Sequence, residues 1–278
     1  MERKLVKQGR NALTVTLPAK WLKQHGLGPG GSVFMQERNH EVIIQTQSLA
    51  ERKEISLDLT GVARSMFFHQ VTGKYLEGYD RIVLIHDNPL VAQEVPELLL
   101  GMIIEEHSAT KTILKSVIAV PDEDFLAILR RSMFMLLQQS KTINLVAQGK
   151  ASLEQVKKDE MLLNCNLFYC LRYLNKYMQA EKAYNYFLLC ATLEEAGDQL
   201  KAIAKHIGKN AKLADIIIKG VEGYVLNLFQ KDVTKVYTLL RVFRDAIPQK
   251  SFVDGLAFSL AETLYNNIGY VHPVKSSS

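Results

Sequence analysis

The sequence predicts a multidomain α+β protein in three parts: a small N-terminal β module, an α/β connecting unit and an all-helical C-terminal half. Short alternating segments broken by glycines occupy residues 1–48, and strand-like and helix-like segments mix in residues 53–120. Apolar residues recur at three- and four-residue steps in residues 121–272, as they do on long helices. A chain of 278 residues has room for two or three domains, so each part is taken as a domain.

The N-terminal module has the densest local pattern in the chain. Residues 13–17 alternate apolar side chains with threonines, which is typical of a half-buried strand. Pro18 suits the start of a short helix carrying the only tryptophan, and Gly26 ends that helix. Residues 28–31 then turn the chain into a strand pair over residues 33–44.

The order of these features, from about residue 2 to 46, resembles the swapped-hairpin DNA-binding domains of the AbrB/MazE/SpoVT superfamily. The shared features are a basic first strand, a V-T-L-P strand end, a tryptophan in the short helix, a glycine turn and a final strand pair. Ser32 stands where that superfamily usually has Asp, which bears on the capping of the turn. Because so few residues bury little apolar surface, the module should need a second copy. The resemblance implies a homodimer formed through this module and double-stranded DNA as its partner.

Positive charge is concentrated in the same module. The chain carries a formal charge of +5, and residues 1–48 hold seven Lys or Arg against three acids, a net of +4. Clustered positive charge is expected of a protein that binds the phosphate backbone, although such residues can also form an ordinary solvated face. Arg10 is the expected base contact, because arginine pairs with guanine edges. The predicted DNA-binding residues are Arg3, Lys4, Lys7, Arg10, Lys20 and Lys23.

The connecting unit follows a polar linker at residues 48–54. The patterns predict strands at residues 55–58, 80–85, 103–104 and 112–120, with helices at 61–76 and at 89–102, the latter interrupted or kinked near Pro96. Residues 73–82 (GKYLEGYDRI) resemble a segment of archaeal-type regulators that join an AbrB part to a PhoU-like part. We find no glycine-rich phosphate-binding motif in this part of the sequence.

Long amphipathic helices are expected after Pro121. Their ranges are 122–148, 153–177, 181–206, 211–229, 233–246 and 252–270, with Ser152 and Gln155 forming a capping box before the second. This half resembles the PhoU-like helical domain, which is built from two three-helix bundles. That resemblance rests on a motif of two carboxylates, Glu194 and Asp198, four residues apart, and it implies a divalent or iron-type metal ion bound there. In the other copy Asn266 replaces the second carboxylate, and ion pairs with Lys201 and Lys205 are the competing interpretation.

Two functions are open on these grounds. The first is a DNA-binding transcriptional regulator, linked by resemblance to phosphate uptake, whose helical domain senses a signal or binds a partner. The second is a PhoU-like signalling adaptor that contacts a phosphate-transport or signalling protein, such as a transporter or kinase, and uses the N-terminal module only to dimerise. An antitoxin is less favoured, because antitoxins usually follow this module with a short disordered tail.

Other classes of protein are not expected. The seven histidines are scattered without a catalytic motif, so we do not expect an enzyme. Three cysteines (Cys165, Cys170 and Cys190) lie among apolar neighbours and are predicted to be buried free thiols. No apolar run is long enough to span a bilayer, and the first residues show no export signal, so we expect a cytoplasmic protein without membrane insertion.

Overall fold

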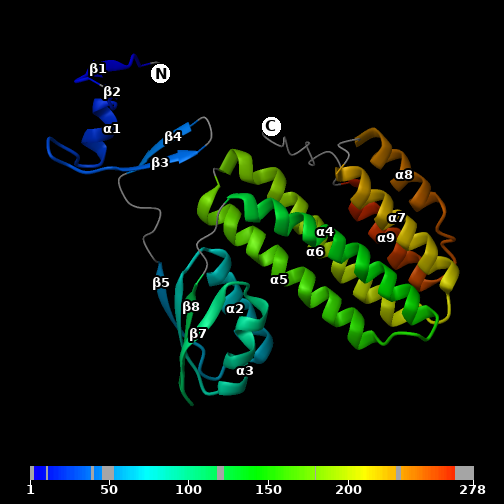
Figure 1. The fold of residues 1–278 in the computed structure, drawn as a ribbon. Helices are drawn as coiled ribbons and strands as arrows, with labels where there is room; N and C mark the ends of the chain where they lie inside the picture. The colour runs from blue at the N-terminus through cyan, green and yellow to red at the C-terminus, as the bar shows by residue number, and fades with distance from the viewer. Residues whose placement is uncertain are drawn as a thin grey trace. The chain divides into compact units, whose positions relative to one another are not determined.

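The computed structural model describes residues 3–10, 12–38, 41–45, 53–117, 122–178, 180–229 and 233–266. The chain divides into two compact units, Met1–Glu51 and Arg52–Ser278 (Figure 1). The predicted linker lies mostly outside the described residues, and its last residue, Glu54, already belongs to a strand. No helix in the described part of the chain is both long and apolar enough to cross a membrane.

The first unit consists of two antiparallel strand pairs separated by a short helix. The strands are β1 (Val6–Gln8), β2 (Ala12–Thr14), β3 (Phe34–Arg38) and β4 (Glu41–Gln45), paired as β1–β2 and β3–β4, with helix α1 (Ala19–Gln24) between the pairs. β2 ends at Thr14, short of the predicted end at residue 17. The predicted turn at Asn39 and His40 lies outside the described residues.

Gly26 ends α1 as the sequence predicts. Its φ of 63° is the left-handed conformation that glycine adopts without strain. The Gly26 N–H donates to the Lys23 carbonyl, and the Leu27 N–H donates to the Leu22 carbonyl at 2.9 Å. These bonds satisfy the last carbonyls of the helix, as in other glycine-terminated helices.

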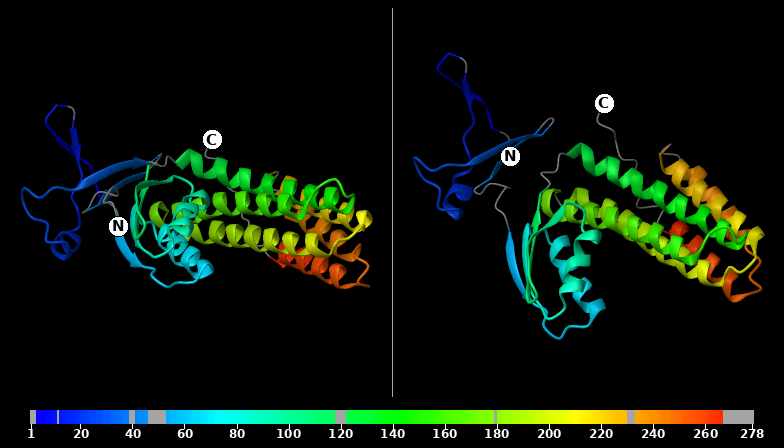
Figure 2. Two further views of the ribbon diagram at one scale, coloured as in Figure 1. Left: turned by 90° about the horizontal axis from the view of Figure 1, so that it is seen from below. Right: turned by 60° about the horizontal axis from the view of Figure 1, so that its bottom comes forward.

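The second unit begins with a four-stranded mixed sheet. Its elements are β5 (Glu54–Asp58), α2 (Arg64–Leu76), β6 (Arg81–Ile85), α3 (Pro89–Glu94), η1 (Val95–Leu98), β7 (Met102–His107) and β8 (Lys111–Ser116). The strand order is β5-β6-β8-β7; β5 and β6 are parallel and the other pairs are antiparallel. Figures 1 and 2 show α2 and α3 on the same face of the sheet.

The predicted interruption near Pro96 is confirmed, but the predicted helical range of residues 89–102 extends too far. α3 ends at Glu94, a 3₁₀ turn follows, and Met102 already pairs with Ser116 in the sheet. Pro96 lacks the N–H that a continuing α-helix needs. Gly101, with a φ of 84°, then turns the chain into β7.

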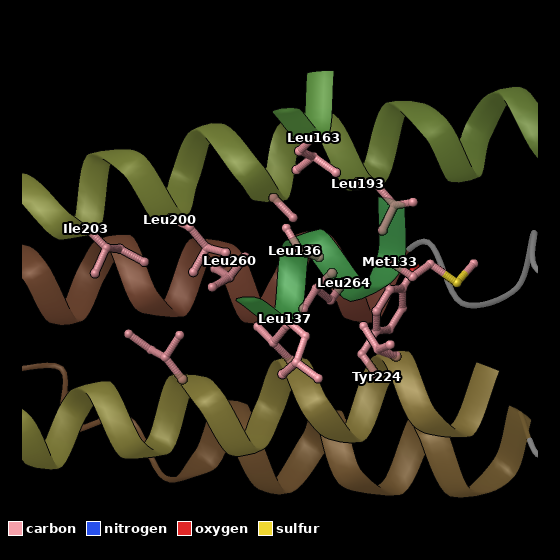
Figure 3. Packing of buried hydrophobic residues seen from close by; sticks show 14 of the residues in the cluster. Met133, Leu136, Leu137, Leu163, Leu193, Leu200, Ile203, Tyr224, Leu260 and Leu264 are labelled. Atoms are coloured by element: carbon pink, nitrogen blue, oxygen red, sulfur yellow. The ribbon is translucent and has the colours of Figure 1, made fainter. Parts of the chain in front are cut away.

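Six helices complete the second unit. They are α4 (Asp122–Ala147), α5 (Leu153–Tyr177), α6 (Ala180–His206), α7 (Ala211–Phe229), α8 (Val233–Asp245) and α9 (Phe252–Asn266). α4 packs against α7 and α6 packs against α9, so the groups α4–α6 and α7–α9 share one hydrophobic core. Figure 3 shows Leu136 and Leu193 of the first group near Tyr224 and Leu264 of the second. The predicted free thiols are confirmed, since all three cysteines are buried and unpaired.

A buried polar contact joins the sheet layer to the helical bundle. We call it the Asp80 junction: Asp80 just before β6, with Arg172 and Lys176 on α5. Arg172 donates to an Asp80 carboxylate oxygen at 2.8 Å and to the carbonyls of Tyr75 and Tyr79 at 2.7 and 2.8 Å, and Lys176 pairs with the same carboxylate. Both cationic side chains are at most 10% exposed.

The junction also fixes the direction of α2 along α5. Asn175 donates to the Leu76 carbonyl at 2.9 Å, and Arg172 donates to the carbonyl of Tyr75. Earlier along both helices, Phe68 of α2 and Asn164 of α5 line one cavity, so the two helices run in the same direction. Gly78 beside this contact has a φ of 90°, a left-handed conformation that glycine adopts without strain.

Candidate nucleic-acid interface

The β1–β2 hairpin presents basic side chains on a small two-stranded sheet. Val6 pairs with Thr14 and Lys7 with Leu13, and the Thr14 hydroxyl donates to the Val6 carbonyl at 3.1 Å. Gly9, with a φ of 69°, supplies the left-handed residue of the turn, and Arg10 follows it. Lys7 therefore lies on the strand and Arg10 at the tip of the hairpin.

All six predicted DNA-binding residues are exposed. Arg3 and Lys4 precede β1, which begins at Val6, so the predicted strand position of Arg3 differs from the structure. Lys20 and Lys23 lie three residues apart on α1, on one side of that helix. Their exposed positions bring these charges within reach of an anionic partner.

The first unit has no interior of its own among its described residues. α1 contains no buried residue, and Trp21 and Leu22, which the sequence places inward, are only half-buried. Large apolar side chains are left exposed on its strands and strand ends: Leu5, Val6, Leu13, Phe34, Met35 and Val42. Isolated strand pairs of this kind are marginal in water and have open edges that can accept another chain.

Sequence reasoning missed the two-sided apolar character of β3. Phe34 is 50% exposed and Met35 is 67% exposed, although they are neighbours on one strand. Successive side chains of a strand point to opposite faces, so β3 presents apolar surface on both. The adjacent pair in the sequence was the signal that could have revealed this surface.

Comparison with known proteins finds a similarity in this region. Residues 6–51 match the family model described as antidote-toxin recognition MazE, bacterial antitoxin. We therefore call residues 6–51 the MazE-type module. The match covers about one-sixth of the chain and leaves the second unit unassigned. No curated protein and no solved structure matches the chain.

The predicted metal-binding pair lies on α6, facing α5. Lys201 reaches between the two helices and contacts Asp198 at 2.7 Å and Glu160 at 3.0 Å. Burial raises the pKa of the half-buried Glu194, and the nearby charges of Asp198 and Glu195 raise it further. The ammonium of Lys201 already supplies a cation to this cluster.

The donor set at this pair does not by itself fit a metal site. Across the described ranges, no group of three or more His, Cys, Asp or Glu side chains is arranged to hold a metal ion. The corresponding four-residue spacing on α9 joins Glu262 and Asn266. Asn266 donates to Glu262, which also pairs with Arg244 at 3.3 Å. The ion pair of Lys201 accounts for the close approach of Asp198 and Glu160, and a metal at Glu194 and Asp198 stays a prediction.

Proposed function

We propose that the protein is a dimeric, non-enzymatic transcriptional regulator that binds double-stranded DNA through its MazE-type module. The observation that carries the proposal is the set of exposed basic side chains on and beside the β1–β2 hairpin and on α1. The family match to this same region supports it. Exposed Lys and Arg side chains release counterions from DNA when they contact phosphates, which gives affinity to any sequence.

The geometry suggests that the basic residues have different roles in DNA binding. Lys7 extends from a strand and Lys23 from α1, and a lysine ammonium serves as a point contact to a phosphate. Arg10 lies at the hairpin tip, and its planar guanidinium can pair with both acceptors on a guanine edge. We infer that the lysines supply affinity and that Arg10 supplies sequence preference.

The test is a salt titration of duplex binding by the full chain and by its Lys7→Ala and Arg10→Ala variants. Loss of one phosphate contact should lower the salt slope by about 1, or by about 2 in a symmetric dimer. Arg10→Ala should also narrow the difference in affinity between preferred and random duplexes. Lys209→Ala is the matched control, because Lys209 is an exposed lysine of the second unit. Equal affinities and slopes for all four proteins would remove DNA binding from this surface.

The second unit has a separate role in this proposal. We infer that it senses a signal or binds a partner, and that the regulated process is phosphate uptake. This last step rests on the PhoU-like sequence pattern around Glu194 and Asp198 alone. If the salt titration fails, an adaptor that contacts a transport or signalling protein becomes the better explanation of the helical bundle.

An antitoxin is the second candidate function, and the description of the matched family favours it. An antitoxin would need a toxin partner, whereas a regulator needs only DNA and its signal. Co-purification of one stoichiometric small protein with the full chain, lost when the MazE-type module is removed, would favour the antitoxin.

A further inference from the structure

A cavity lies between α2 and α5, next to η1, within the second unit. Its volume is about 300 Å³, near the lower end for small-molecule sites. Phe68 on α2, Leu98 on η1, and Met161 and Phe168 on α5 form its apolar walls. Three elements that are distant in sequence therefore enclose one small, mostly apolar space.

The walls of this cavity are held in place from both sides. The Asp80 junction fixes the later turns of α2 against α5. The Cys165 thiol donates to the Glu97 carbonyl at 3.2 Å, which fixes η1 against α5 beside the cavity, and burial raises the pKa of that thiol to about 11. A neutral thiol at this position keeps its role as a donor.

Polar groups also line the cavity, and one of them lacks a partner. The Asn164 amide nitrogen donates to a Glu160 carboxylate oxygen at 2.7 Å. Because a carboxylate only accepts, this bond sets the orientation of the amide. The Asn164 amide oxygen is then an acceptor, and it is buried without a hydrogen-bond partner among the described atoms. A buried acceptor left unpaired costs free energy that a ligand donor would recover.

The charges near the cavity favour a cation over an anion. Among the described residues, the titratable side chains that line it are Glu160 and His69. Glu194 and Asp198 on α6 lie near Glu160, with Lys201 as the cation of this group. The guanidinium of Arg64 lies 5.1 Å from the centre of the Phe68 ring, but it is already paired with Glu94. Aromatic faces such as Phe68 and Phe168 also attract cations.

We propose that this cavity is a binding site for a small protonated organic amine with an apolar body. The ammonium group would donate to Glu160 and to the free oxygen of Asn164, and the apolar body would lie between Phe68 and Phe168. Such a ligand contacts both α2 and α5, so its binding would add to the contact between the sheet layer and the helical bundle. The proposal does not depend on DNA binding.

The probe for the test is phenethylamine, titrated into the full chain and followed by ligand-observed NMR. Phenethyl alcohol is the neutral analogue of nearly the same shape, and hydrocinnamate is the anionic one. The amine should bind saturably, the alcohol should bind about tenfold more weakly, and the acid should not bind measurably. The reason is that a hydrogen bond to a charged group changes the affinity by about tenfold or more. Binding of the alcohol or the acid as tight as that of the amine, or no saturable binding of the amine, would overturn the proposal.

Two variants locate the binding. Glu160→Gln and Asn164→Leu should each weaken amine binding about tenfold. Glu154→Gln is the matched control on the same helix, because Glu154 is exposed and pairs only with Lys157 in the described contacts. Circular dichroism establishes which variants are folded. If the loss of charge in Glu160→Gln disturbs α5, Asn164→Leu remains as a test, because it keeps the Glu160–Lys201 ion pair. Unchanged affinity in either folded variant would place the amine elsewhere and overturn the proposal.

Discussion

The imidazole of His86 lies in a buried chain of hydrogen bonds at the end of β6. His86 is 2% exposed, and its Nε2 lies 2.8 Å from the Thr112 hydroxyl oxygen. Nδ1 of His107 lies 2.8 Å from the same oxygen. A threonine hydroxyl donates one proton, so it can donate to one ring and accept from the other when both rings are neutral. Nδ1 of His86 has no partner among the described atoms.

We predict that this histidine makes stability depend on pH. Burial lowers the pKa of His86, and the neighbouring His107 lowers it further. As the pH falls below about 6.5, the unfolded chain takes up a proton that the folded chain resists. The stabilisation is therefore present at neutral pH and lost as the pH falls through the folded-state pKa of His86. Urea unfolding of the second unit at pH 7 and 5.5, followed by circular dichroism, should show the loss.

His86→Gln should reduce this pH dependence, because glutamine does not titrate and can still bond to Thr112. His69→Gln is the matched control, since His69 is exposed on α2. Glu194 works in the opposite direction, because its pKa is raised and its effect favours the folded state at low pH. An identical change in unfolding free energy for the wild type and His86→Gln would assign the pH dependence to other groups.

At the scale of elements, the Asp80 junction holds the end of α2 against α5. One carboxylate serves two nearly buried cations there. Loss of Arg172 would leave Asp80 with Lys176 as its cation and would remove the nearly buried donors to the carbonyls of Tyr75 and Tyr79. We predict that Arg172→Met lowers the unfolding free energy of the second unit by about 3 kcal/mol. Urea unfolding followed by circular dichroism measures the change.

The matched control for this prediction is Arg241→Met on α8. Its pair with Asp245 is exposed on both sides, so its loss should cost less than about 1 kcal/mol. Asp80→Asn should be as damaging as Arg172→Met, because it leaves Arg172 and Lys176 facing each other. A loss at Arg172 no larger than that at Arg241 would show that the junction does not stabilise the unit.

The sequence predicts elements well where their ends are marked locally. α5 runs over the predicted residues because Ser152 accepts the Gln155 N–H at its start, although the Gln155 side chain bonds to Asp159 and does not complete the capping box. The sequence predicted an interruption or a kink near Pro96 but not which of the two, because both look alike in a single sequence; the structure has a 3₁₀ turn there. Local signals define where an element begins and ends.

Contacts between distant elements could not be predicted in this way. Gly220 lies inside α7, where a Cβ would overlap the Phe243 ring of α8, yet in the sequence it is only a weak helix residue. Residues 73–82 were singled out by resemblance, but their contact with Arg172 follows from the packing of α2 on α5. The same holds for Asn164, whose position beside Phe68 no periodicity reveals. At the candidate DNA interface, by contrast, exposure of all six basic residues follows from their charge alone.

At the scale of the whole molecule, we predict a dimer formed through the MazE-type module. Its exposed apolar side chains and open strand edges need a second copy to cover them. Sedimentation at micromolar concentration should give a mass near twice 31.4 kDa. A monomer at that concentration would contradict the proposed assembly.

The single tryptophan offers an independent check on this dimer. Trp21 lies on α1, so its fluorescence reports on the first unit and not on the second. If pairing completes the module, the unfolding midpoint seen by this fluorescence should rise with protein concentration. The midpoint seen by circular dichroism, which is dominated by the helices of the second unit, should change much less.

The lack of an interior among the described residues of the MazE-type module has a consequence for how activity depends on protein concentration. When a protein must pair before its binding surface is complete, and pairs are the minor species, the amount of complete surface rises with the square of the protein concentration. A modest change in synthesis or degradation then becomes a larger change in the amount of complete surface. Under the proposed function, the abundance of the chain would itself regulate DNA binding.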